Sequence, residues 1–138
     1  MISIIIASVL AFGFGAAWYM GPIGKKWLDA KIWSEQNIEM SQTGKYMAMM
    51  YGSSFALTVL VSYVLSVMFT VVDAVTLGEH LRLAMLLCFG FVITTKFSDM
   101  LYTGTPPFWG KRAQTVFLVD SGYYIGVFAI IATVLYYL

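Results

Sequence analysis

Residues 46–72 read YMAMMYGSSFALTVLVSYVLSVMFTVV and contain no charged side chain. A helix that crosses a bilayer needs roughly 20 predominantly apolar residues, so this stretch is long enough to span one. The composition of the whole chain agrees, because 60% of its 138 residues are hydrophobic and 11% are charged, whereas a soluble domain carries about 25% charged residues. A chain of this size cannot bury that much apolar surface inside itself. The sequence therefore predicts that the bilayer is its solvent.

Three further stretches have the composition of membrane spans. Residues 1–24 carry no charge, residues 83–95 form a shorter apolar run, and residues 113–138 carry only Asp120. We predict an all-α membrane protein that forms one domain over residues 1–138. Its four transmembrane helices are expected at about residues 2–20, 46–72, 77–97 and 107–137.

Local signals set the starts of the last two helices. Thr76 and Glu79 have the spacing of a capping box, in which each side chain bonds a free backbone N–H of the first turn. A helix that starts there is long enough to span. Thr105 can cap the fourth helix, and Pro106 and Pro107 suit a first turn whose N–H groups have no partners.

Basic residues predict the orientation, because cytoplasmic loops of membrane proteins are enriched in Lys and Arg. Only Arg82 lies in the middle loop, and the other seven basic residues flank the first and third loops: Lys25, Lys26, Lys31, Lys45, Lys96, Lys111 and Arg112. We expect these two loops in the cytoplasm and both termini outside, in the cell membrane as a multi-pass protein, most simply a bacterial inner membrane. The four tryptophans fall at the same boundary and are predicted to be interfacial anchors: Trp18, Trp27, Trp33 and Trp109.

The first loop has a pattern of its own. Trp27, Leu28, Ile32 and Trp33 alternate with charged residues at near-helical spacing. This favours a short interfacial helix whose apolar side lies among the headgroups. An ordered hairpin loop with tryptophan anchors explains the pattern equally well, and both interpretations stay open.

The two cytoplasmic hairpins resemble each other. Residues 18–26 read WYMGPIGKK, while residues 101–106 read LYTGTP and residues 110–112 read GKR. Each has a Tyr-x-Gly, a proline, and then a glycine followed by two basic residues. The likeness predicts two parallel hairpins related by a pseudo-two-fold axis along the membrane normal. Because such turns are common in membrane hairpins, chance similarity is the alternative.

The same residues carry a family resemblance. The run at residues 18–27, WYMGPIGKKW, the Ser98-Asp99 pair before the second Gly/Pro loop, and residues 120–124, DSGYY, are similar to the domain of unknown function 1761 family of small bacterial integral membrane proteins. The resemblance covers nearly the whole chain. It implies a four-span fold and carries over no reaction, cofactor or catalytic residue.

Small residues recur at helical spacing and predict where helices meet. In lipid, helix association depends on close backbone approach, which small residues permit. The first span has two such faces, and we expect both to pack inside the chain, the alternative being that one meets a neighbouring subunit. The predicted packing positions are Ala7, Ala11 and Gly15 on one face, Gly13, Ala17 and Gly21 on the other, Gly52 and Ala56 in the second span, and Gly122 and Gly126 in the fourth.

Asp120 is the most informative polar residue. A carboxylate at bilayer depth costs on the order of 2.5–3.5 kcal/mol, so it needs a partner or a proton. We favour a structural pair with Lys96 or Tyr19 that locks the bundle; the alternative is a polar or proton-responsive site. Further groups expected at a similar depth on the same side are Asp99, Tyr102, Tyr123 and Tyr124.

Other chemistry has little support in the sequence. His80 is the only histidine and is expected to be solvated; a lone histidine makes a poor metal site. No phosphate-binding or nucleophile motif is present, so we predict no cofactor, no metal and no enzymatic activity. The net charge of +1 indicates no nucleic-acid partner.

Three functions remain in order of preference. The first is a small non-enzymatic membrane module, a homo-oligomer or an accessory subunit, whose partners are the lipid bilayer and itself or another membrane protein. The second is a small transporter or channel whose pathway passes Asp120. The third, and least favoured, is an enzyme that acts on a lipid through Asp99 and Asp120, for which no nucleophile–base pair can be named.

The orientation is testable by cysteine accessibility. In a Cys88→Ala background, Ser41→Cys should react with a membrane-impermeant thiol reagent only after the cells are made permeable, because the first loop is predicted to be cytoplasmic. Labelling of Ser41→Cys in intact cells would show that the orientation is inverted.

Overall fold

The computed structural model of the chain describes residues 1–31, 43–102 and 110–138. Every regular element in these ranges is a helix. The order is α1 (Ile2–Met20), α2 (Pro22–Lys31), α4 (Gly44–Val71), α5 (Leu77–Leu87), the π-helical η1 (Cys88–Ile93), α6 (Thr94–Tyr102) and α7 (Lys111–Tyr137). Within the described ranges, four helices are long and apolar enough to cross a membrane: α1, α4, the continuous run α5–η1–α6, and α7. The prediction of an all-helical chain with four candidate spans is confirmed.

The helix ends differ from the predicted ones at two places. The third span continues to Tyr102 rather than ending near residue 97. The fourth begins at Lys111 with Gly110 as its N-cap, later than the predicted residue 107. The expected capping residues Thr105, Pro106 and Pro107 lie outside the described residues.

The predicted capping box at the start of α5 is present. The Thr76 side chain accepts a hydrogen bond from the Glu79 backbone N–H (3.2 Å), and Glu79 Oε2 accepts one from the Thr76 N–H (2.8 Å). Since both bonds use donors that a first helical turn leaves free, the sequence signal and the local structure agree.

A wide turn lets the third span continue without a break. In η1 the backbone bonds one residue further along than in an α-helix, which changes the partners of nearby carbonyl groups. The Thr94 and Thr95 hydroxyls donate to the carbonyls of Gly90 (2.7 Å) and Phe91 (2.6 Å). These side chains satisfy the carbonyls in place of water, which hydrocarbon does not contain.

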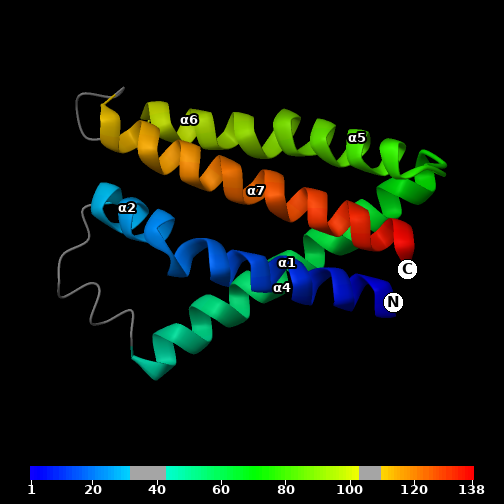
Figure 1. Cartoon of the computed structure of the whole chain (residues 1–138), viewed down its shortest axis with the longest axis horizontal. Coiled ribbons are helices and arrows are strands. Elements are labelled where there is room, and N and C mark those ends of the chain that lie inside the picture. The colour runs from blue at the N-terminus through cyan, green and yellow to red at the C-terminus, as the bar shows by residue number, and fades with distance from the viewer. Residues whose placement is uncertain (32–42, 103–109) are drawn as a thin grey trace.

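Helices α1 and α7 form the centre of the bundle. Helix α4 packs on α1, and α5, η1 and α6 pack along α7 on the side away from α1 (Figure 1). The two termini lie at one end of the bundle, and α2 lies at the other (Figure 1). We call this second end the basic end, because it carries Lys25, Lys26, Lys31, Lys45, Lys96, Lys111 and Arg112.

Helix α4 crosses the other helices obliquely, and its N-terminal half diverges from α7 (Figure 1). A two-fold axis that related the hairpins would make α4 pack on α5 as α1 packs on α7. The contact between α4 and α5 is instead much less extensive than that between α1 and α7. The two-fold relation therefore stays a prediction, to which this arrangement adds no support.

The contact between α1 and α4 combines small residues with one polar pair. Ala7, Ala11, Ser8 and Ser62 are fully buried. The Ser8 and Ser62 hydroxyl oxygens lie 3.0 Å apart and share a hydrogen bond across the two helices. A buried bond of this kind links spans for which apolar packing alone gives little preference over lipid.

The predicted small-residue positions in α1 and α7 lie at close contacts with aromatic rings. A Cβ atom added at Gly15 would stand 2.9 Å from the Tyr123 ring, and one at Gly122 would stand 3.0 Å from Trp18. At Gly126 it would stand 2.5 Å from two atoms of the Phe14 ring. Because these glycines have no side chain, an aromatic ring of the neighbouring helix packs on the backbone at each of them, and α1 and α7 approach closely.

Two other predicted packing positions meet no other described helix of the chain. Gly52 has no atom within 4 Å of an added Cβ, and Ala56 is exposed. The second face of α1 is also open, since Gly13 meets nothing and Ala17 is exposed. Helices α4 and α7 both pack on one face of α1. The other face, which Gly21 continues at the end of the helix, has no contact with them.

Replacement of Gly126 by leucine should destabilise the bundle by about 1–3 kcal/mol, the usual cost of overpacking a filled core. Phe14 has little room to retreat, because its ring lies against Trp18 (5.4 Å between centroids) and Tyr123 (6.3 Å). Thermal unfolding in mild detergent, followed by far-UV circular dichroism, measures the change. The control is Gly52→Leu, which should leave the melting temperature unchanged or higher. Equal melting temperatures for the two variants would contradict the contact.

Candidate functional site

Asp120 lies on the third turn of α7, towards the basic end, and only 6% of its surface is exposed. A single ionised carboxylate at this depth is costly unless the protein itself replaces the water. Three side chains do so, and each comes from a different helix.

The carboxylate accepts hydrogen bonds from α1, α2 and α6. Tyr19 Oη donates to Oδ1 (2.9 Å), and Trp27 Nε1 donates to the same oxygen (2.8 Å). Lys96 Nζ lies 3.4 Å from Oδ2 and forms an ion pair. The predicted partners Lys96 and Tyr19 are therefore both present. We call Asp120, Tyr19, Trp27 and Lys96 the Asp120 cluster.

Trp27 reaches the cluster because the chain turns sharply after α1. Gly21 is extended and Pro22 opens α2, a position that suits proline because it has no N–H and the first N–H of a helix has no partner within the helix. Gly24 packs directly on the Tyr19 backbone, where any Cβ would overlap the carbonyl. This contact lays α2 back against α1 and α7, which turns the Trp27 indole towards Asp120.

The two tryptophans that the structure describes bond α7 through their indole N–H groups, and their place at the membrane boundary stays a prediction. Trp18 Nε1 donates to the Val119 carbonyl (3.2 Å), and Trp27 Nε1 donates to Asp120. Both indole N–H groups thus connect other helices to α7. Trp33 and Trp109 lie outside the described residues. The predicted short helix in the first loop is present as α2, whereas its place in the headgroup region stays a prediction.

Aromatic rings surround the cluster. Tyr123 packs on Tyr19 (5.2 Å between centroids) and on Tyr124 (5.0 Å). Lys96 Nζ lies 5.6 Å above the Tyr124 ring, so the ammonium group has a π-face as well as a carboxylate. Tyr123 and Tyr124 therefore support the cluster, as the spacing along α7 predicts.

The structure places the two remaining predicted site residues elsewhere. Tyr102 is 82% exposed at the end of α6, and Asp99 is also exposed. Both lie beyond Lys96 on α6 and point to the surface of the basic end. Their similar predicted depth grouped them with Asp120, but their exposure sets them apart from the buried carboxylate.

His80 is buried rather than solvated. Only 8% of its surface is exposed. The centroids of the His80 and Phe69 rings lie 4.3 Å apart, and His80 Nδ1 lies 3.0 Å from the Thr76 carbonyl oxygen. It links the start of α5 to the end of α4 and packs on Tyr136 of α7. This is a packing role at the end of the bundle opposite to Asp120.

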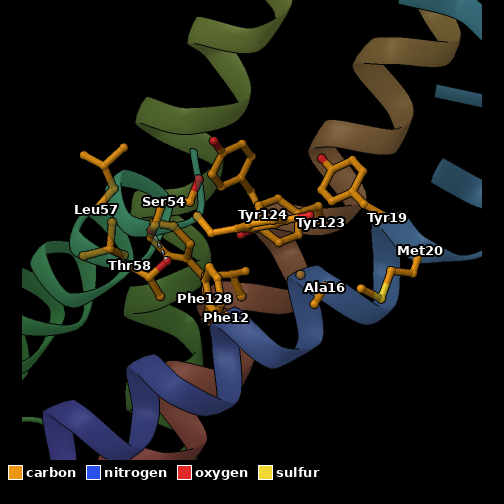
Figure 2. A pocket seen from close by; sticks show the side chains of 14 residues that line it. Phe12, Ala16, Tyr19, Met20, Ser54, Leu57, Thr58, Tyr123, Tyr124 and Phe128 are labelled. Carbon is orange, nitrogen blue, oxygen red and sulfur yellow. Dashed lines mark hydrogen bonds between the residues drawn. The ribbon is translucent and has the colours of Figure 1, made fainter. Parts of the chain in front are cut away.

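A groove of about 470 Å³ opens between α1, α4 and α7. Figure 2 shows Tyr19, Tyr123 and Tyr124 on one wall and Ser54, Leu57 and Thr58 of α4 on the other, with Phe12 and Phe128 between them. The groove exists because α4 diverges from α7. Tyr19 belongs to both the groove and the Asp120 cluster, which makes it the link between them.

The charges of the Asp120 cluster are balanced within the chain. Both carboxylate oxygens of Asp120 are engaged by donors, and the ammonium of Lys96 balances its charge. Among the described residues, no three His, Cys, Asp or Glu side chains come together as a metal site. The fold and the site thus define a small helical protein with four candidate membrane spans and a neutralised polar cluster inside them.

The comparison with known families gives the chain its place. The chain belongs to the family described as "Protein of unknown function (DUF1761)", whose family model matches residues 2–136. The resemblance inferred from the sequence is confirmed. No curated protein and no solved structure matches the chain.

Replacement of Asp120 tests the cluster. Asp120→Leu removes the acceptor of the partly buried Tyr19 hydroxyl and Trp27 indole N–H, at a cost of about 1–3 kcal/mol for each hydrogen bond lost. The loss of the ion pair with Lys96 adds little to this cost, because the Lys96 side chain is 30% exposed and can turn to water. Asp120→Asn keeps one acceptor oxygen and should cost less. Unfolding in mild detergent measures both, with Asp29→Leu, at an exposed carboxylate of α2, as the control. A stable Asp120→Leu variant would show that the cluster does not hold the helices together.

Proposed function

We propose that this protein is a small non-enzymatic membrane module that assembles with copies of itself or with a larger membrane complex. The observation that carries the proposal is the closed state of the Asp120 cluster. All of its charge is compensated inside the chain, and its bonds tie α1, α2 and α6 to α7. A group bound in this way holds helices in position, and each of its oxygens already has a donor.

The open face of α1 supports assembly. Gly13 and Ala17 lie on the outside of the bundle, and an added Cβ at Gly21 would meet only the carbonyl of Ala17 in its own helix. A row of small residues on a lipid-facing helix lets a second helix approach closely. This face fits a neighbouring subunit, since the helices of the same chain leave it uncovered.

The proposed setting is the bacterial inner membrane, with the basic end in the cytoplasm. The support is the distribution of the basic residues, of which only Arg82 lies away from that end. In this orientation the termini face outward, and α2 lies at the cytoplasmic surface.

A transporter or channel is the second candidate. The observation that favours it is the groove, which reaches Tyr19 and through it the Asp120 carboxylate. In that case Asp120→Asn should leave the fold intact and abolish a pH-dependent flux in vesicles. For a structural module, the same variant changes stability slightly and there is no flux to lose.

The oligomer can be tested with paired substitutions. Gly13→Leu should weaken self-association in mild detergent by at least about tenfold in dissociation constant, which corresponds to 1.4 kcal/mol, because the new side chain holds the backbones apart. Native mass spectrometry across a range of protein concentrations measures the association. The control is Gly52→Leu, which enlarges an open position on α4.

Two results would contradict the assembly proposal. One is a wild-type chain that stays monomeric at all concentrations and forms no cross-link to another membrane protein from position 17 in cells. The other is an oligomer that Gly13→Leu leaves intact.

A further inference from the structure

The groove between α1, α4 and α7 has the depth of one leaflet. Along α1 it extends from Met20 to Phe12, which at 1.5 Å per residue is about 12 Å. Along α4 it extends from Tyr51 to Val61, or about 15 Å. Half of a hydrocarbon core that is roughly 30 Å thick is about 15 Å. The groove therefore reaches from the basic end to about the middle of the membrane.

The walls of the groove suit hydrocarbon. They are mainly aromatic and aliphatic, with Phe12, Leu57, Val127 and Phe128 in the deeper part. The Thr58 hydroxyl in the wall donates to the Ser54 carbonyl (2.9 Å), and the Tyr19 hydroxyl donates to Asp120. A flexible alkyl chain gains apolar contacts here. The hydroxyl groups of Thr58 and Tyr19 keep their partners within the protein when it binds.

The size of the groove separates an alkyl chain from a helix. A volume of about 470 Å³ lies within the range of small-molecule sites, roughly 300–1,000 Å³. A helix is at least about 10 Å wide with its side chains, so a 12 Å length of it fills on the order of 900 Å³. A helix from a second copy does not fit without a large movement of α4.

The charge at the basic end favours an anionic headgroup. The exposed basic side chains at this end are Lys25, Lys26, Lys31, Lys45, Lys111 and Arg112, and the exposed acidic ones among the described residues are Asp29 and Asp99. Asp120 adds no net charge because Lys96 pairs with it. An excess of Lys and Arg at a membrane surface attracts anionic lipid.

We propose that the groove binds one acyl chain of an anionic phospholipid from the leaflet at the basic end. The chain lies between α4 and the Tyr19–Tyr123–Tyr124 wall, and the phosphate faces the basic side chains. The lipid fills the space that α4 leaves when it diverges from α7. This site lies on a different face of α1 from the one proposed for assembly.

Native mass spectrometry of the full chain, released from vesicles of phosphatidylglycerol and phosphatidylcholine with identical acyl chains in equal amounts, tests the proposal. We expect retained phosphatidylglycerol to exceed phosphatidylcholine by at least about fivefold. Ala16→Phe, which places a ring in the groove, should reduce retained lipid to the level of nonspecific adducts. Ala17→Phe, one residue further along on the exposed face of α1, should retain lipid as the wild type does.

A second measurement uses the wild-type protein and tests the proposal even if Ala16→Phe does not fold. Phosphatidylglycerol with a photoreactive diazirine in the acyl chain should cross-link the wild-type protein at groove residues such as Tyr51 and Leu57. Exposed residues on the far side, Leu86 and Phe91, serve as the comparison. Equal labelling of the two regions, equal retention of the two lipids, or a cross-linked second copy in the groove would each overturn the proposal.

The same variants separate this proposal from that of assembly. Ala17→Phe should weaken the oligomer and keep the lipid, whereas Ala16→Phe should keep the oligomer and lose the lipid. Loss of lipid binding in Ala17→Phe alone would overturn the lipid site, and an oligomer unaffected by Ala17→Phe would count against assembly through α1.

Discussion

A carboxylate inside a membrane has no water to solvate it, so the chain must supply every partner of Asp120. Much of the arrangement at the basic end follows from this constraint. Tyr19 comes from the end of α1, Trp27 from α2 and Lys96 from α6. Each partner requires its helix to stand at a particular height and rotation against α7. One buried charge thus fixes the relative positions of four elements that apolar packing in lipid would leave poorly specified.

The remaining contacts are arranged around this cluster. Close approach of α1 and α7 depends on glycines that receive aromatic rings, with Phe14 at Gly126 and Trp18 at Gly122. The contact between α1 and α4 has its own polar pair, Ser8 with Ser62. Because α4 provides none of the three donors to Asp120, nothing in the cluster holds its N-terminal half to α7. The groove opens where α4 leaves the bundle.

This division also separates two kinds of role within one small chain. The Asp120 cluster connects the helices, while the described helices leave the groove and one face of α1 open. Tyr19 is the single side chain common to the cluster and the groove. The ring whose hydroxyl secures Asp120 is therefore also part of the groove wall.

The sequence by itself determined the four spans, the capping box at Thr76 and the need of Asp120 for Lys96 or Tyr19. These features depend on local composition, on short spacings, or on the high cost of a charge in hydrocarbon. Only the tertiary structure decided that Trp27 bonds Asp120, that His80 is buried and that Gly52 faces outward. Amphipathic and small residues suit a lipid interface and a helix contact equally well. Which of the two they meet depends on the rotation and crossing of helices, which the order of residues along one span does not specify.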